Sequence, residues 1–387
     1  MIVVGVVLAA LPVVLLLYAY LGYPAISWLL SRRRPPMLVV GDPAEWPEIT
    51  IVLPVYNEAG AIADTLESLL ALDYPPGRRH VLVVSDCSND GTDELVRGFA
   101  HRDVRLLRLE QRGGKTAAEN AAGVELRGTI AVNTDATIRI LPHSLKALIR
   151  VFEDPAIGVA SGRDVSVSRS IAEGNRGESG YVDYEMWLRG LETRAGSIVG
   201  ASGCFYAIRR GLFDVLFPSA LSRDFASALI AVEHGFRAVS VDDAICLVPR
   251  TGSLRAEYRR KVRTMARGLE TLWYKRHMLL KGRNRLFAFQ LASHKLIRWL
   301  VFLVAPGFPI GLAIIGFSHR WAWWALGGVL FGLVLGGLAL VWPNQRTVPR
   351  PLALLGFALA AHAAGFMAWT KALRGELNPV WEPTRRS

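Results

Sequence analysis

Three charged side chains stand in short polar segments where the sequence could support chemistry. They are Asp86 in VSDCSNDGT, Lys115 in RGGKTAAEN and Asp135 in AVNTDAT. Carboxylates bind hard divalent cations or accept protons. A lysine preceded by two glycines can meet a phosphate, because glycine lets the backbone approach closely. The set therefore indicates a site for a phosphorylated ligand, a metal ion, or both.

The segments around these residues predict an α/β domain. The chain alternates apolar, β-prone runs (48–57, 80–92, 104–110, 128–137) with helical patterns (60–72, 93–100, 116–126). Such alternation is typical of a mostly parallel sheet covered on both faces. Ligands bind beyond the carboxyl ends of the strands, so we expect Glu58, Asp86 and Asp135 on one rim.

Two common nucleotide-binding motifs do not match this domain. No G-x-G-x-x-G follows the first strand, which argues against a dinucleotide fold. RGGKTA looks like the end of a P-loop, but the earlier glycine that such a loop requires falls at Leu109.

Apolar segments near both ends of the chain predict membrane helices. Of the 387 residues 51% are hydrophobic, and residues 2–30 carry no charge, which is enough to cross a hydrocarbon core of about 30 Å. No basic region precedes this segment, so we expect an uncleaved anchor. Three more apolar stretches, at 296–317, 321–342 and 352–370, favour spans over buried core helices. His294 lies beside them with no acid paired to it in the sequence, and we assign it no chemistry.

The formal net charge of +12 is concentrated beside the apolar segments. This pattern favours a lipid bilayer over nucleic acid as the partner. Arginines at 32–34 place the middle domain in the cytosol by the positive-inside rule. Four spans would then leave a basic C-terminal tail outside, a conflict that a re-entrant segment around Pro306 and Pro309 would resolve.

Seven motifs occur in the order and spacing of one known family. They are LPVYNE, VSDCSNDGT, RGGKTAAEN, TDAT, SGCFYAIRR, SRDFASALIAVEHGFRAV and RRKVRTMARG, spread over residues 48–270. The set resembles family 2 glycosyltransferases of the cellulose and hyaluronan synthase type. The resemblance implies a GT-A fold, a nucleoside-diphosphate sugar donor, a Mg²⁺ or Mn²⁺ ion, and inverting transfer.

The resemblance assigns nucleotide-sugar binding to residues in the first half of the domain. The matching positions are Pro54, Tyr56 and Glu58 in the first nucleotide-binding loop, Asp86 at the base and Lys115 near the diphosphate. Asp90, in the same turn as Asp86, would either shape that turn or contact the nucleotide.

Asp135 matches the first acid of the family's D-x-D motif, which binds metal and diphosphate. The third position is Thr137 rather than an acid. We expect Thr137, Asn133 or water to complete the metal shell. A carboxylate that caps a helix is the alternative for Asp135.

Asp224 matches the catalytic base of the family. Relatives carry an acid pair here, whereas Arg223 precedes Asp224, so Asp224 would act alone with the arginine beside it. The alternative is a salt-bridged aspartate that caps a helix over 225–235.

RRKVRTMARG stands where polymerising relatives carry Q-x-x-R-W. Arg263 matches the arginine that meets the diphosphate, and Thr264 replaces the tryptophan that stacks on the acceptor sugar. Arg260, Arg263 and Arg267 share one helix face by their spacing. Residues 254–283 have an amphipathic pattern, so we expect Arg263 to face the site and the other two arginines to face lipid.

Four parts are predicted: a transmembrane helix over 1–30, a cytosolic GT-A domain over 45–250, amphipathic interfacial helices over 251–290 and about three transmembrane helices over 294–373. The predicted activity is metal-dependent inverting transfer of a hexose or N-acetylhexosamine. The donor would be UDP-linked, and the acceptor a lipid-linked molecule or a glycan in cell-envelope synthesis. The alternatives are a processive polysaccharide synthase and, in another class, a non-catalytic membrane scaffold or nucleotide-sugar-binding module. We expect a protein of the bacterial inner membrane.

Overall fold

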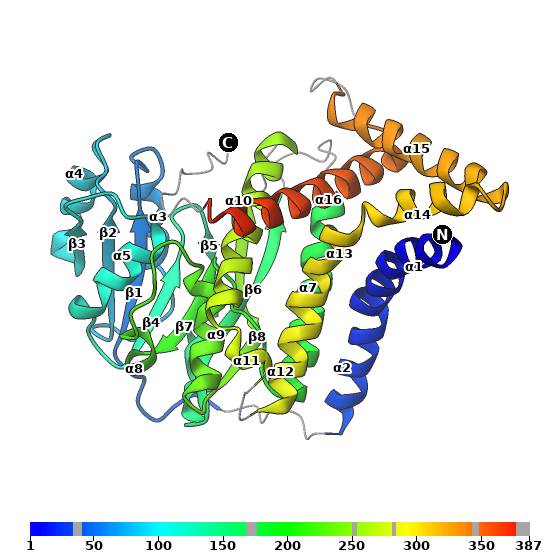
Figure 1. Cartoon of the computed structure of the whole chain (residues 1–387). Helices are drawn as coiled ribbons and strands as arrows, with labels where there is room; N and C mark the ends of the chain where they lie inside the picture. The colour runs from blue at the N-terminus through cyan, green and yellow to red at the C-terminus, as the bar shows by residue number, and fades with distance from the viewer. Residues whose placement is uncertain (34–40, 168–175, 250–253, 281–283, 343–347, 377–387) are drawn as a thin grey trace.

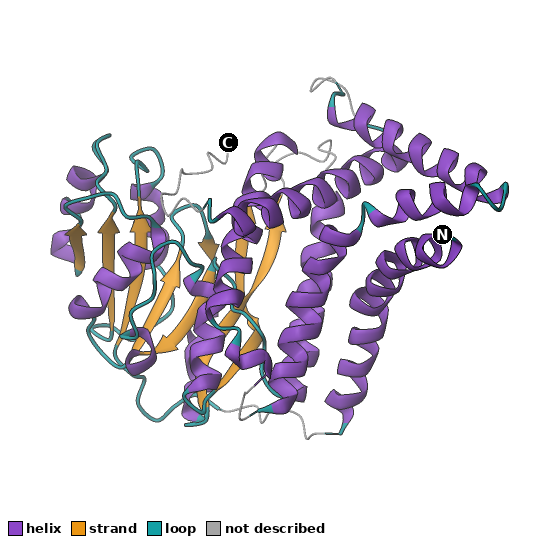
Figure 2. Cartoon of the chain, viewed as in Figure 1, coloured by secondary structure: helices purple, strands orange, loops and turns teal. Residues whose placement is uncertain are grey.

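The computed structural model describes the chain except for residues 34–40, 168–175, 250–253, 281–283, 343–347 and 377–387. A sheet covered by helices forms one side of the molecule, and long apolar helices form the other (Figures 1 and 2). Arg34, Arg385 and Arg386, which entered the prediction of orientation, lie outside the described residues.

One mixed sheet forms the core of the domain, in the order β3-β2-β1-β4-β7-β6-β8-β5. Its strands are β1 (Ile49–Val55), β2 (Arg79–Ser85), β3 (Val104–Arg108), β4 (Ile130–Thr134), β5 (Arg139–Ile140), β6 (Ile157–Val167), β7 (Phe205–Arg209) and β8 (Arg237–Pro249). β1 to β4 pair in parallel, whereas β7 is antiparallel to both β4 and β6. The predicted α/β class is confirmed.

Both faces of the sheet are buried because its central strands are apolar on both sides. Along β1, Ile51 and Leu53 belong to one core cluster and Val52 to the opposite one. The first face is covered by α3 (Ile62–Leu70) and α6 (Ser144–Arg150). The second is covered by α5 (Lys115–Ala122), α8 (Arg210–Phe213) and α9 (Arg223–Glu233), while α4 (Thr92–Arg97) lies beside β3.

The long apolar helices come from both ends of the chain. α1 (Ile2–Leu17) continues through a π-helical turn into α2 (Tyr23–Arg32). The C-terminal part contains α12 (Arg285–Leu291), α13 (Arg298–Val304), α14 (Gly307–Gly316), α15 (Trp321–Leu340) and α16 (Arg350–Arg374). Among the described residues, four helices are long and apolar enough to cross a membrane: 2–32, 285–304, 321–340 and 350–374.

The apolar stretch predicted over 296–317 is not one helix, so the limits of that span were wrong. α13 ends at Val304 and α14 begins after Pro306, whose ring and missing N–H oppose continuation of a helix. The span-length helix instead starts at Arg285. α14 packs against α1, where Ala9 meets Leu312.

Three helices connect the sheet domain to the apolar helices (Figure 1): α7 (Arg176–Ala195), α10 (Leu254–Tyr274) and α11 (His277–Leu280). α7 lies between β8 and α2. α10 packs through Ala266 and Leu269 against Ala368 of α16. The end of the sheet domain is thereby held beside α1, α13 and α16.

Candidate functional site

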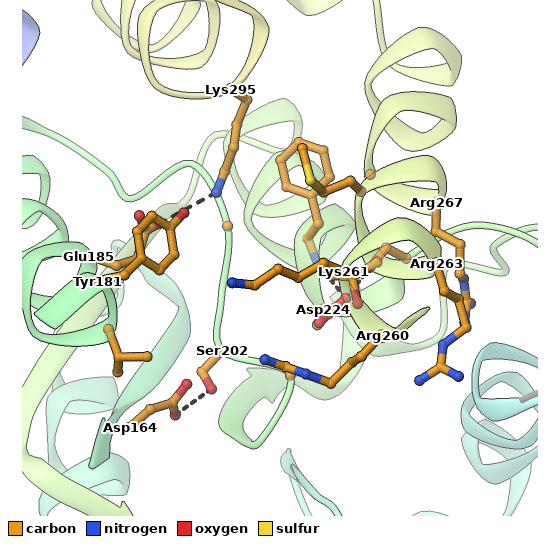
Figure 3. A pocket seen from close by; sticks show the side chains of 18 of the residues that line it. Asp164, Tyr181, Glu185, Ser202, Asp224, Arg260, Lys261, Arg263, Arg267 and Lys295 are labelled. Atoms are coloured by element: carbon orange, nitrogen blue, oxygen red, sulfur yellow. Dashed lines mark hydrogen bonds and ion pairs between the residues drawn. The ribbon is translucent and has the colours of Figure 1, made fainter. Parts of the chain in front are cut away.

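A pocket of about 920 Å³ lies between the sheet domain and the apolar helices (Figure 3). It is lined by six of the residues predicted from the sequence: Glu58, Lys115, Asp135, Thr137, Asp224 and Arg263. The other three, Pro54, Tyr56 and Asp86, are not part of its lining but stand at the carboxyl ends of β1 and β2. The expected rim therefore exists, and the pocket begins at one side of it.

Lys115 links two loops at the centre of the pocket. Its Nζ donates to Asp135 Oδ1 at 2.6 Å and to the carbonyl oxygen of Gly203 at 2.8 Å. Burial opposes the charge of this ammonium group, but nearby carboxylates, above all Asp135, raise the pKa of Lys115. A permanently charged cation thus faces the pocket at the position where the sequence predicts a diphosphate.

The loop before Lys115 is shaped by Asp86. This carboxylate is 1% exposed; its Oδ1 accepts from the N–H of Gly113 at 2.7 Å and its Oδ2 from the N–H of Gly114 at 2.9 Å. Gly114 has a φ of 83°, which residues with a side chain rarely adopt. Asp86 is a buried support of the loop, and its contact with a nucleotide base stays a prediction.

The loops after β1 and β2 are joined by hydrogen bonds that include Asp90. Its Oδ2 accepts from the N–H of Ala59 at 3.0 Å and its Oδ1 from the N–H of Thr92 at 3.1 Å. Although partial burial opposes it, these hydrogen bonds lower the pKa of Asp90. Asp90 therefore shapes the turn, which is one of the two roles predicted for it.

Asp224 lies in the first turn of α9 and faces the pocket. Its Oδ1 accepts from the Ser222 hydroxyl and from the N–H of Phe225 at 2.8 Å. The neighbouring Arg223 does not form the salt bridge considered as the alternative, because its side chain is buried and donates to Asn120 instead. Consecutive residues on a helix point about 100° apart, so a neighbour in sequence is not a neighbour in space.

Gly203 brings the backbone between Lys115 and Asp224. A Cβ atom at Gly203 would lie 2.4 Å from Asp224 Oδ2, well inside contact distance. Only glycine therefore leaves the carboxylate where it stands.

The segment before Asp224 is supported by α10. Arg267 donates to the carbonyl oxygen of Leu221 at 2.5 Å and to Thr116 Oγ1 at 2.9 Å. Thr271 Oγ1 accepts from the N–H of Ser222 at 2.9 Å. These bonds tie the start of α9 to α10.

Both arginines predicted to face lipid turn toward the protein instead. Arg267 makes the hydrogen bonds just described, and Arg260 lines the pocket together with Arg263. Figure 3 shows Arg260 reaching from α10 into the pocket. The expectation for Arg260 and Arg267 was wrong because α10 packs against α16 with its apolar side, which turns its basic side to the pocket.

The residues around Asp135 fit a divalent cation only together with a ligand. Asp135 and Thr137 line the pocket, whereas Asn133 is fully buried in β4 and does not. In the described part of the chain, no three His, Cys, Asp or Glu side chains are grouped closely enough to hold a metal ion. One carboxylate and one hydroxyl suit Mg²⁺ or Mn²⁺ when substrate phosphates supply further oxygens.

Glu119 is a pocket residue that the sequence analysis missed. Its side chain is 1% exposed and it stands one helical turn after Lys115 on α5. Burial raises the pKa of Glu119 to about 7, although the Lys115 charge acts in the opposite direction. Its spacing of four residues from Lys115 puts both on one helix face, which is the signal that could have revealed it.

Glu185 on α7 is a second missed acid, on the helix side of the pocket. Its Oε2 accepts from Arg298 at 2.7 Å, and its Oε1 lies 3.5 Å from Lys295 Nζ. His294 lies between Glu185 and Glu192, at 2.9 and 2.6 Å. The statement that this histidine has no acid partner was wrong. Its partners are more than 100 residues away in the sequence.

Known proteins resemble the chain in sequence. Residues 50–217 match the model of the family described as Glycosyl transferase family 2. An N-acetylglucosaminyltransferase of Rhizobium meliloti (strain 1021) is 26% identical over 369 residues, which cover 89% of this chain and 83% of that protein. A poly-beta-1,6-N-acetyl-D-glucosamine synthase of Staphylococcus aureus (strain MSSA476) is 26% identical over 231 residues, 58% of this chain and 55% of that protein. The chain thus matches about half the length of this second relative.

A solved structure resembles the chain along nearly its whole length. It is a mannosyltransferase from Pyrobaculum calidifontis in complex with GDP-Man and Mn²⁺, and the match covers 95% of this chain and 99% of that chain. The TM-score is 0.72 and the sequence identity 24%, so this likeness concerns the fold. The predicted GT-A fold is confirmed.

Proposed function

We propose that this chain, a family 2 glycosyltransferase whose residues 50–217 match that family's model, transfers one sugar with inversion. The donor is a nucleoside-diphosphate sugar, and the acceptor is a lipid-linked molecule or a glycan. One observation carries the proposal. Lys115, Asp135 and Asp224 line a single pocket although they stand far apart in the sequence, and Gly203 contacts both Lys115 and Asp224.

Asp224 is the proposed base. It takes the proton of the acceptor hydroxyl, whose oxygen forms a bond to the anomeric carbon on the face opposite the diphosphate. The bond from that carbon to the phosphate oxygen breaks, and the nucleoside diphosphate leaves with the electron pair. The Ser222 hydroxyl and the N–H of Phe225 orient the carboxylate for this task.

The proposed donor site extends from Asp135 toward the rim of the sheet. Lys115 and Arg263 neutralise the diphosphate, and Asp135 with Thr137 would hold Mg²⁺ or Mn²⁺ against it. When bound, this ion supplies a Lewis acid for the charge on the leaving group. The nucleoside would lie toward the loop of Pro54, Tyr56, Glu58 and Asp86.

We propose a UDP-linked hexose or N-acetylhexosamine as the donor. The support is the name of the Rhizobium meliloti relative, an N-acetylglucosaminyltransferase that matches most of this chain. The transferase domain is proposed to face the cytosol of a bacterium. The helices of span length support membrane insertion, and the arginines at 32 and 33 support this orientation.

A processive polysaccharide synthase is the second candidate. The Staphylococcus aureus relative, named as a polysaccharide synthase, favours it. Thr264, in place of the tryptophan of the resembling synthases, argues for single addition, because a threonine offers no aromatic face to a sugar ring. The length of the product separates the two.

The experiment measures release of UDP from UDP-N-acetylglucosamine by the full chain in lipid nanodiscs, with Mn²⁺ or Mg²⁺ and a membrane lipid extract as acceptor. Asp224→Asn should reduce turnover about 100-fold or more while donor binding persists, because a general base contributes that much. Asp243→Asn is the matched control, since Asp243 is exposed and pairs with Arg150 outside the pocket. Unchanged turnover in Asp224→Asn, or turnover that needs no acceptor, would contradict the proposal.

A further inference from the structure

We propose that the acceptor is an anionic lipid whose chain enters the pocket sideways between α1, α13 and α16. Its phosphate would be held by basic side chains at the boundary of the sheet domain, and a hydroxyl of its headgroup would face Asp224. This inference rests on the proposed transferase function and specifies the acceptor.

The first support is an apolar arm of the pocket that continues between the membrane-length helices. The arm is lined by Leu17, Leu21, Val301, Phe302, Phe357 and Ala361. These side chains belong to three helices that are long and apolar enough to cross a membrane, so the arm opens among segments expected in lipid. The same pocket holds Lys115 and Asp224 at its other end. A sugar-only acceptor would leave this apolar surface unused.

The second support is a set of cations, here called the neck, where the arm meets the polar part. The neck consists of Arg260, Lys261, Lys295 and Arg298. Lys261 Nζ lies 4.0 Å from the ring centre of Phe357, so one residue of the neck touches one of the arm. Figure 3 shows Lys261 and Arg260 extending from α10 into the pocket, opposite Lys295.

Two cations of the neck, Lys295 and Arg298, share the carboxylate of Glu185. Two further nitrogens of Arg298, Nε and Nη2, are buried without a hydrogen-bond partner among the described residues. Buried donors without partners are costly, and phosphate oxygens are strong acceptors for guanidinium and ammonium groups. A ligand with a phosphate held by the neck and an apolar chain held by the arm has the chemistry of an anionic lipid.

In this arrangement, the acceptor is bound by one group of residues and reacts at another. The neck would hold the acceptor by its phosphate, which is not consumed. The headgroup hydroxyl loses its proton to Asp224 and forms the glycosidic bond, while the nucleoside diphosphate leaves toward Lys115. The product stays anchored in the bilayer by its chain.

The first test measures binding rather than turnover, so it does not depend on catalysis. The full chain in phosphatidylcholine nanodiscs is titrated with pyrene-labelled dodecyl phosphate and with pyrene-labelled dodecanol. We expect the phosphate to bind at least about tenfold more tightly. Equal binding of the two probes would overturn the anionic headgroup.

Matched variants locate the binding. Ala361→Trp fills the arm and should weaken both probes, whereas Ala363→Trp, on an exposed position of α16 outside the pocket, should weaken neither. Lys261→Gln should weaken only the phosphate probe, and Arg259→Gln, an exposed neighbour outside the pocket lining, should not. Equal effects within either pair would overturn the proposed route, and thermal unfolding in detergent checks that each variant is folded.

The second test follows the sugar. With radiolabelled UDP-N-acetylglucosamine and nanodiscs that contain phosphatidylinositol or a polyprenyl-diphosphate sugar, label should enter the organic phase, and Ala361→Trp should reduce it at least about tenfold. Label that enters only a water-soluble glycan, with Ala361→Trp unaffected, would overturn the lipid acceptor and leave the transferase proposal standing. Conversely, weaker probe binding in Ala361→Trp and Lys261→Gln together with full activity of Asp224→Asn would support the lipid site and overturn the proposed catalytic base.

Discussion

The two halves of the pocket are built in different ways. In the half formed by the sheet domain, polar side chains are held by hydrogen bonds from loops, as Asp224 is by the Ser222 hydroxyl and the N–H of Phe225. In the half formed by α1, α13 and α16, the lining is mostly apolar, with cations at its inner edge. The sheet half has the rigid polar geometry that a nucleotide donor requires, and the helix half has the surface that a lipid chain requires.

Loss of the central cation is expected to have the largest effect on the sheet half. Lys115→Gln removes the ammonium paired with Asp135, and one such electrostatic contact to a leaving group contributes about 100- to 1,000-fold in turnover. Steady-state kinetics with UDP-N-acetylglucosamine measure it. Lys146→Gln, which breaks a surface ion pair with Asp73, should leave turnover unchanged. Similar kinetics in the two variants would show that the sheet half does not contact the donor phosphates.

Crowding the junction of the halves is expected to have the next largest effect. Gly203→Ala places a methyl group against Asp224 Oδ2 and should lower turnover about 10- to 100-fold, because a displaced base loses its alignment. Gly211→Ala is the control, since a Cβ there meets nothing within 4 Å. The unfolding temperature of both variants should stay close to that of the parent protein. If Gly203→Ala retained full turnover, the position of Asp224 would not matter to the reaction.

A pH-dependent effect on stability is expected from Glu119 in the sheet half. Its pKa of about 7, against an ordinary value of 4.5, means that the folded protein keeps a proton that the unfolded chain has released between these pH values. The stability contributed by this group is therefore complete below pH 4.5 and lost as the pH rises to about 7. At pH 8, Glu119→Gln should therefore be more stable than the parent protein. We expect a higher unfolding temperature and a free energy of unfolding that is greater by up to about 3 kcal/mol.

The control for this comparison is Glu125→Gln, an exposed acid on the same side of the domain. The difference between Glu119→Gln and the parent protein should shrink when unfolding is measured at pH 4.5. A difference that is equal at pH 4.5 and pH 8 would mean that the Glu119 carboxyl is not protonated in the folded protein.

The smallest effect is expected from α10, which joins the halves. Thr271→Val removes the acceptor for the N–H of Ser222, at a cost of about 1–2 kcal/mol, since a buried donor is left unpaired. Chemical denaturation measures it, with the exposed Thr264→Val on the same helix as control. Equal stability of the two variants would mean that α10 contributes nothing to the support of Asp224.

Much of the sheet half was predictable from the sequence, because its polar residues follow apolar runs whose period and order specify a parallel sheet. Asp135 and Glu58 were placed on the rim by that rule alone. The helix half was predicted less well. Arg260 and Arg267 were assigned to lipid because amphipathicity tells which residues share a face, but not what packs against that face. Glu185 and His294 were missed as a pair because they are 109 residues apart.

By itself, the sequence determined the α/β class and the apolar segments at both ends, and it predicted Lys115, Asp135 and, through the family resemblance, Asp224 as site residues. These properties depend on local patterns of apolar residues and on the chemistry of single side chains, which the chain carries without folding. Only the tertiary structure decided that Arg223 points away from Asp224, that Gly203 stands between Asp224 and Lys115, and that the pocket continues between α1, α13 and α16. Those features depend on how the helices pack on one another, and packing is set by contacts between residues far apart in the chain.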